Sequence, residues 1–288
     1  MIAILGGLGA AVMWAAANLT SSRSSKLIGA SSTVAWMMLV GLIIAWPLSV
    51  ATGKVPPITP ALAFWLFGSG VGSVVGLLLV YAGLRIGKVG VVTALASTEG
   101  AIAAVLAVVA GESLTIPVAV MLCVIVVGIA VVAFAAGTAA EAGAAPVAAG
   151  DETRAVIFGV LAALAFGVTI YSTAQLGKSM PPLMAVLPAR VVGVVGVFVP
   201  LALTGRLQLT RRAVPMVVLI GAAEVFGNAS YVIGAGESIA ISAVLASQFA
   251  AVAAVVAFFL FRERLSVPQR SGILAICVGV AMLTAFRG

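Results

Sequence analysis

Three charged residues stand inside long apolar runs and are the main candidates for chemistry: Arg190, Glu224 and Glu99. A charge at the centre of a membrane helix costs about 2.5–3.5 kcal/mol or more, so it usually marks a functional site. Arg190 offers a rigid fork of donors for an anionic group such as a carboxylate. Glu224 or Glu99 would take and release a proton, because the chain has no histidine. Alternatively, an arginine–glutamate pair simply holds two helices together.

Uncharged residues in or near these runs could complete a solute-binding cavity. Asn228 and Tyr231 follow Glu224 by four and seven positions, so all three share one helix face. Trp14 and Phe166 would form an aromatic wall of the cavity, or packed core. The full set of predicted substrate contacts is Arg190, Asn228, Tyr231, Tyr81, Asn18, Trp14, Tyr171, Gln248 and Ser97. In lipid, such polar groups also form hydrogen bonds between helices, so the alternative for each of these residues is a role in helix packing.

Pro188 lies two residues before Arg190 and predicts a kinked or broken helix there. A broken helix beside a buried charge is typical of a transporter binding site. An ordinary packing kink is the alternative. Gly68, Gly72 and Gly76 recur every four residues and predict a stripe of close helix packing.

The composition decides what surrounds these residues. Of 288 residues, 63% are hydrophobic and only 8% are charged, whereas a soluble domain carries about 25% charged residues. The chain therefore cannot cover a soluble globule, and we expect an integral membrane protein. The net charge of +7 is spread in short clusters between apolar runs, which argues against a nucleic-acid-binding stripe. The two cysteines lie within apolar runs and are interpreted as small hydrophobic residues.

The apolar runs predict an all-α, polytopic membrane protein with ten transmembrane helices. A helix needs about 20 apolar residues to cross a bilayer. The predicted spans are 2–20, 31–52, 61–84, 88–110, 116–137, 154–175, 182–204, 214–236, 238–261 and 267–286. The short alternating segments of a membrane β-barrel do not occur in the sequence.

A small, acidic segment divides the spans into two groups of five. We expect a first five-helix repeat at 1–137, a linker at 138–153 and a second repeat at 154–288. Residues match between the halves at a nearly constant offset: Gly41 corresponds to Gly193, and Leu95-Ala96-Ser97 to Leu245-Ala246-Ser247. The charged candidates lack charged counterparts, since Arg190 corresponds to Met38.

Because five is odd, the second repeat must be inverted relative to the first, as in many transporters. Lysine and arginine gather in cytoplasmic loops. Eleven basic residues fall in the odd-numbered connections, against three in the even-numbered connections and the C-terminus, which predicts that both termini lie outside the cytoplasm. The basic residues of the odd-numbered connections are Arg23, Lys26, Arg85, Lys88, Arg154, Arg206, Arg211, Arg212, Arg262, Arg264 and Arg270.

Each half closes with a related stretch. Gly111-Glu112-Ser113-Leu114-Thr115-Ile116-Pro117 leads to Gly128, and Arg262-Glu263-Arg264-Leu265-Ser266-Val267-Pro268-Gln269 leads to Gly272 and Gly279. With Trp14 and Gly227-Asn228, this pattern resembles the EamA family of the drug/metabolite transporter superfamily. The resemblance implies transport of small metabolites, amino acids or drugs, often in exchange for protons. Thr115 and Ser266 are predicted N-caps, which makes the closing stretches structural.

The leading functional hypothesis is a proton-coupled exporter of a small metabolite in the cell inner membrane, with alternating access around a midplane cavity. An uncoupled facilitator is the second hypothesis, and a membrane scaffold or lipid-handling protein without solute transport is the third. An enzyme is not expected, because the sequence holds no metal cluster, nucleophile motif or cofactor loop. No cofactor or nucleic acid is expected. The expected partners are the solute, protons and the lipid bilayer, and the chain is expected to be either a monomer or a homodimer.

Overall fold

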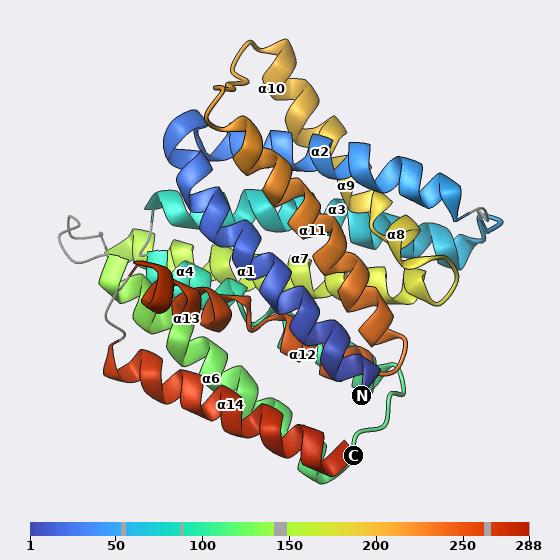
Figure 1. Cartoon of the computed structure of the whole chain (residues 1–288), viewed down its shortest axis with the longest axis vertical. Coiled ribbons are helices and arrows are strands. Elements are labelled where there is room, and N and C mark those ends of the chain that lie inside the picture. The colour runs from blue at the N-terminus through green and yellow to red at the C-terminus, as the bar shows by residue number, and fades with distance from the viewer. Residues whose placement is uncertain (53–55, 87–88, 141–148, 262–265, 288) are drawn as a thin grey trace.

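A computed structural model describes residues 1–52, 56–86, 89–140, 149–261 and 266–287. Every regular element within these residues is helical, which confirms the predicted all-α fold for this part of the chain (Figure 1). Eight helical stretches of the described chain are long and apolar enough to cross a membrane. The long helices are α1 (Ile2–Ile28), α2 (Ala30–Ala51), α3 (Pro60–Ile86), α6 (Ile116–Ala140), α7 (Ala149–Gly177), α11 (Val214–Ala235) and α14 (Val267–Arg287).

The predicted span 182–204 is a chain of short elements. These are α8 (Pro182–Ala185), α9 (Leu187–Gly193), the π-helical turn η1 (Val194–Phe198) and α10 (Val199–Leu203). Pro188 occupies the second residue of α9, where the missing N–H of proline costs no helical hydrogen bond. The interruption therefore falls at Val186, and Arg190 follows it within one turn.

Two further predicted spans are not continuous helices. The span 88–110 consists of α4 (Val89–Ala96) and α5 (Glu99–Val109), and the span 238–261 consists of α12 (Ile239–Ala246) and α13 (Phe249–Phe261). The Thr98 hydroxyl donates to Leu95 O at 2.7 Å, and the Ser247 hydroxyl donates to Ala243 O at 3.0 Å. Such side chains compete for backbone carbonyls and weaken a helix locally. The breaks fall at the matched Leu-Ala-Ser motifs.

Several helices run past the predicted ends. Helix α1 continues to Ile28 and not to residue 20, because nothing between breaks a helix until Gly29. Gly29 has φ 80°, a left-handed conformation that glycine adopts readily, and it alone separates α1 from α2. Of the predicted linker, residues 138–140 belong to α6 and 149–153 to α7; its middle, 141–148, lies outside the described residues.

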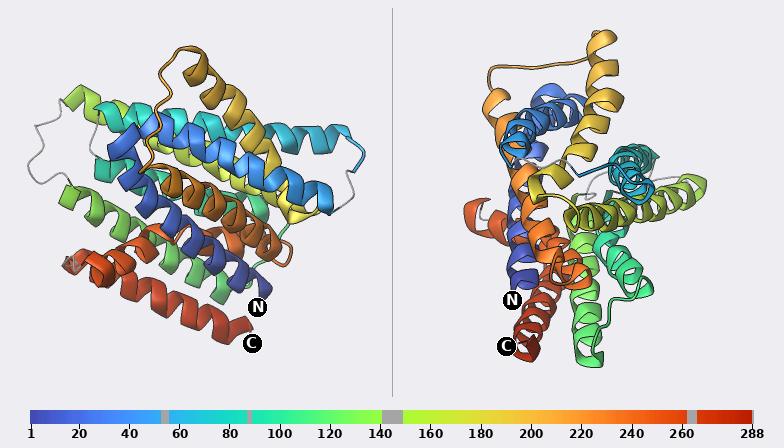
Figure 2. Two further views of the ribbon diagram at one scale, coloured as in Figure 1. Left: turned by 45° about the horizontal axis from the view of Figure 1, so that its top comes forward. Right: turned by 90° about the vertical axis from the view of Figure 1, so that its right-hand side faces the viewer.

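The strongest helix pairs each join one half of the sequence to the other. Helix α3 packs on α7, α1 on α11, and α6 on α14. The last pair lies along one edge of the molecule, and both termini lie at the same end of the bundle (Figures 1 and 2). The halves are therefore interleaved and do not form separate bodies.

The predicted glycine stripe on α3 is confirmed as a packing surface against α7. A Cβ atom at Gly72 would lie 2.5 Å from the Thr169 hydroxyl oxygen, and one at Gly76 would lie 2.5 Å from the Phe166 ring. A Cβ at Gly68 would meet Ser172 equally closely. The absence of side chains brings the two helices together and places Thr169 and Phe166 at the interior.

Candidate functional site

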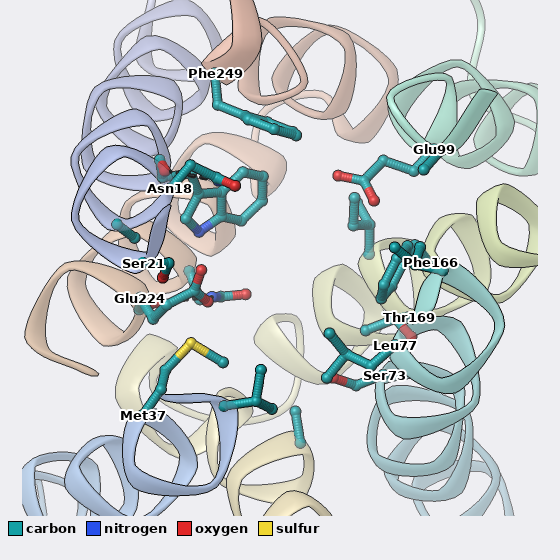
Figure 3. Close-up of a pocket in the computed structure, with 18 of the residues that line it drawn as sticks. Asn18, Ser21, Met37, Ser73, Leu77, Glu99, Phe166, Thr169, Glu224 and Phe249 are labelled. Carbon is teal, nitrogen blue, oxygen red and sulfur yellow. Dashed lines mark hydrogen bonds between the residues drawn. The ribbon is translucent and has the colours of Figure 1, made fainter. Parts of the chain in front are cut away.

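A cavity of about 620 Å³ lies between helices of both halves. Figure 3 shows it from within the bundle, with α1 and α11 on one side and α3, α5 and α7 on the other. Its principal polar and aromatic lining residues are Trp14, Asn18, Ser21, Ser25, Thr33, Ser73, Ser97, Glu99, Phe166, Thr169, Thr173, Arg190, Glu224, Asn228 and Phe249. A cavity of this size is typical of small-molecule sites.

Arg190 of α9 and Glu224 of α11 form an ion pair at one wall of the cavity. Arg190 Nη2 lies 3.1 Å from Glu224 Oε2, with the arginine side chain 3% exposed and the glutamate side chain 22% exposed. The Asn228 amide donates to the Glu224 carbonyl oxygen at 2.7 Å and to Oε2 at 3.4 Å. These contacts hold the Glu224 carboxylate at the cavity surface while the guanidinium is buried behind it.

Helix α2 provides the space that the arginine occupies. A Cβ at Gly41 would lie only 3.0 Å from Arg190 Cδ. Arg190 Nη1 donates to Met38 Sδ at 3.5 Å, and the buried Nε has no hydrogen-bond partner among the described residues. The predicted role of Arg190 as an anchor for an anionic solute remains a prediction; in the structure the guanidinium already has a carboxylate partner.

Glu99 faces the ion pair from the opposite wall. It is the first residue of α5, directly after the helix break, and its carboxylate points into the cavity between Phe166 and Phe249 (Figure 3). No hydrogen bond to this carboxylate occurs within the described part of the chain. The break between α4 and α5 thus immediately precedes the residue whose carboxylate faces the cavity.

Aromatic rings line much of the remaining surface. Trp14 and Phe249 meet edge to face with ring centroids 6.3 Å apart, and Phe166 lies across from them. Both members of the predicted aromatic wall, Trp14 and Phe166, therefore reach the cavity. The indole Nε1 of Trp14 is buried without a hydrogen-bond partner among the described atoms.

The structure brings six of the other predicted residues to the cavity and leaves the rest elsewhere. Those that line it with Arg190 are Trp14, Asn18, Ser97, Glu99, Glu224 and Asn228. Tyr231 does not, although it shares a helix with Glu224: it is 1% exposed and its hydroxyl donates to Ile170 O at 3.1 Å. Seven residues from Glu224 is two turns along the helix, which carries Tyr231 past the cavity into the core.

Tyr171 and Gln248 also lie outside the cavity lining. The Tyr171 hydroxyl accepts a hydrogen bond from Gln175 Nε2 at 2.6 Å, and its ring packs against Trp65. Gln248 is 3% exposed at the break between α12 and α13. Pro188 shapes α9 and is not a lining residue. Tyr81 lies on α3, and its side chain lies outside the described residues.

A row of small hydroxyl residues that the sequence did not predict also lines the cavity. Ser21 and Ser25 continue the cavity-facing side of α1 after Trp14 and Asn18. The spacing of four, three and four residues was visible as one helix face, but the predicted span ended at residue 20. Ser73 and Thr169 could not be predicted as lining residues, because each lies in a glycine- and valine-containing stretch without a nearby charge.

Comparisons with known proteins agree with this architecture. The profile of the EamA-like transporter family matches residues 1–134 and again residues 153–285. The chain belongs to the EamA-like transporter family, and so it is a multi-pass membrane transporter of the drug/metabolite type. The family model thus matches the chain twice, once in each half of the sequence.

A solved structure described only as "Crystal structure of protein" is 16% identical to the chain, with a TM-score of 0.76. The alignment covers 99% of this chain and 96% of that one, and it supports the fold alone. No curated protein matches the sequence.

Proposed function

We propose that the chain is a secondary active transporter that carries a small solute through the cavity between its two halves by alternating access. The observation that carries this proposal is the cavity itself, which is lined from both halves and holds an ion pair and a further carboxylate. Charged side chains within a bilayer are energetically unfavourable, and their presence in a cavity is typical of a solute pathway.

The proposed mechanism requires two inverted repeats of five crossings each, with α4–α5 and α12–α13 as broken crossings and α8–α10 as a third. Reciprocal contacts between α2 and α9 support a two-fold relation. Met38 and Arg190 occupy matching positions, as do Gly41 and Gly193; Arg190 lies on Gly41, and a Cβ at Gly193 would meet Met38 at 2.6 Å. Such exchanged contacts are typical of a two-fold axis.

Proton coupling is assigned in this proposal to the cavity carboxylates Glu224 and Glu99. Glu224 is held by Arg190 and Asn228, so a protonation change there would weaken the ion pair and loosen α9 from α11. An uncoupled facilitator is the second candidate, because the same ion pair satisfies Glu224 without any transported proton. The proposed location is the cell inner membrane, with both termini outside the cytoplasm.

Proteoliposome counterflow separates these candidates. A thermal-shift screen of the purified protein against amino acids, polyamines, sugars and nucleosides first identifies a ligand, because a ligand of the native state raises its stability. Counterflow of that ligand is then measured with and without a pH gradient. We expect the gradient to drive accumulation and Glu224→Gln to abolish this drive while sparing folding. Counterflow that ignores the gradient in the unmodified protein would support the facilitator, and no counterflow of any bound ligand would contradict transport.

A further inference from the structure

The charges that face the cavity do not balance. Among the described residues, its lining contains one guanidinium, Arg190, and two carboxylates, Glu224 and Glu99. The ion pair of Arg190 with Glu224 is neutral as a unit. Glu99 is the carboxylate without a cationic partner among the described lining residues, and it stands on the opposite wall (Figure 3).

The described lining residues offer an anionic solute no accessible positive group. The Arg190 side chain is only 3% exposed and is already paired with Glu224, while Met38 and Gly41 contact it from α2. A carboxylate would have to displace Glu224 from the ion pair and would then face Glu99. Both steps oppose binding, since like charges within a low-dielectric cavity repel strongly.

A cationic solute meets the opposite situation. The Glu99 carboxylate points into the cavity, with no hydrogen-bond donor from the described chain to satisfy it, and Phe166 and Phe249 flank it (Figure 3). Aromatic faces attract cations, most strongly where water is excluded. Trp14, Leu77 and Met37 extend the wall as an apolar surface, which would accommodate a hydrocarbon body attached to the charged group.

We propose that the transported solute is an amphiphilic organic cation, an amine or quaternary ammonium group on an apolar or aromatic body, with Glu99 as its counter-charge. This inference rests on the proposed function, because it names the substrate class of the same cavity. It assigns Glu99 to solute binding and leaves the Arg190–Glu224 pair as the neutral wall opposite.

The test uses three ligands with the same body and different heads: 4-phenylbutylamine, 4-phenylbutan-1-ol and 4-phenylbutanoate. Binding to the purified full-length protein is measured by isothermal titration calorimetry at neutral pH. The informative variant is Glu99→Gln, which keeps the shape and removes the charge. Glu152→Gln is the matched control, since Glu152 lies on α7 outside the cavity lining.

We expect the amine to bind at least about tenfold more tightly than the alcohol and the alcohol more tightly than the carboxylate. Glu99→Gln should remove the advantage of the amine over the alcohol, and Glu152→Gln should preserve it. Tightest binding of the carboxylate, or an amine preference that Glu99→Gln leaves intact, would overturn the cation assignment while a solute site remains. Absence of binding by all three ligands to a protein that still unfolds cooperatively would overturn the cation assignment, and counterflow with other solutes would then decide the proposed function separately.

Discussion

Met38 and Arg190 occupy matching positions in the two halves of the sequence, and their side chains contact each other, with Arg190 Nη1 donating to Met38 Sδ at 3.5 Å. Where α2 and α9 meet, one half contributes a thioether and the other a guanidinium. The two halves thus differ in sequence at a position where they contact each other, and both residues line the cavity. The buried Arg190 guanidinium therefore has two partners: the thioether sulfur of Met38 from the first half, and the carboxylate of Glu224 from the second.

Removing the charge of Arg190 should destabilise the protein through the carboxylate it leaves behind. Arg190→Met, which restores the residue of the first half, should lower the free energy of unfolding by about 3 kcal/mol or less, because breaking a buried pair costs about 3–5 kcal/mol and Glu224 is partly exposed. Adding Glu224→Gln should recover most of that loss. Chemical unfolding in mixed micelles measures both variants, and a double variant no more stable than Arg190→Met would refute this account of the pair.

Helices α1 and α11 approach each other closely at Gly6 and Gly234. A Cβ atom at Gly6 would lie 2.5 Å from Gly234 Cα, a backbone atom that cannot move independently of its helix. Gly6→Ala should therefore cost about 1–3 kcal/mol of stability through overpacking. Gly196→Ala is the control, since its Cβ would lie 3.6 Å from Val74. Equal melting temperatures for the two variants would show that α1 and α11 are not packed this closely.

Glu112, just before α6, caps the N-terminus of α12 in the other half. Its Oε2 accepts from Ile239 N at 3.1 Å, and Oε1 accepts from the Ser238 hydroxyl. The negative charge also suits the positive end of the helix. Glu112→Gln should cost about 1–2 kcal/mol, because hydrogen bonds to a charged group are worth more than neutral ones. Thermal unfolding measures the loss; an unchanged melting temperature would contradict a stabilising role for this cap.

The distribution of basic residues predicts that both termini lie outside the cytoplasm. A reporter that is active only outside the cytoplasm, fused after Gly288, should therefore be active, and one active only in the cytoplasm should be silent. Fusion of the same reporters after Gly29, in the first connection, should give the opposite pattern. Cytoplasmic activity at Gly288 would reverse the proposed orientation.

Much of the fold followed from the apolar runs, because lipid requires long helices with satisfied backbone groups. The breaks at Ser97–Thr98 and Ser247–Gln248 could not be predicted from hydropathy, since serine, threonine and glutamine leave a run apolar on average. The matched Leu-Ala-Ser motifs predicted a feature common to both halves, but they did not identify it as a helix break.

The charged residues of the site were predictable from the sequence. Glu99, Arg190 and Glu224 all reach the cavity, because a charge in a span must face something other than lipid. Tyr231 and Tyr171 were indistinguishable from lining residues in the sequence, since a tyrosine hydroxyl is satisfied equally by a backbone carbonyl or a solute. Ser21 and Ser25 were missed because the apolar run ends before the helix does.

Transport by alternating access requires that one cavity opens in turn to the two sides of the membrane, and cysteine accessibility tests this without knowledge of the solute. Cys123 and Cys277 are exposed and can be replaced by alanine, after which Ser73→Cys places a single thiol in the cavity lining. A membrane-impermeant maleimide should label this thiol from the cytoplasmic side and, in oppositely oriented vesicles, from the other side. Labelling from one side only, in the presence and absence of 4-phenylbutylamine, would contradict alternating access.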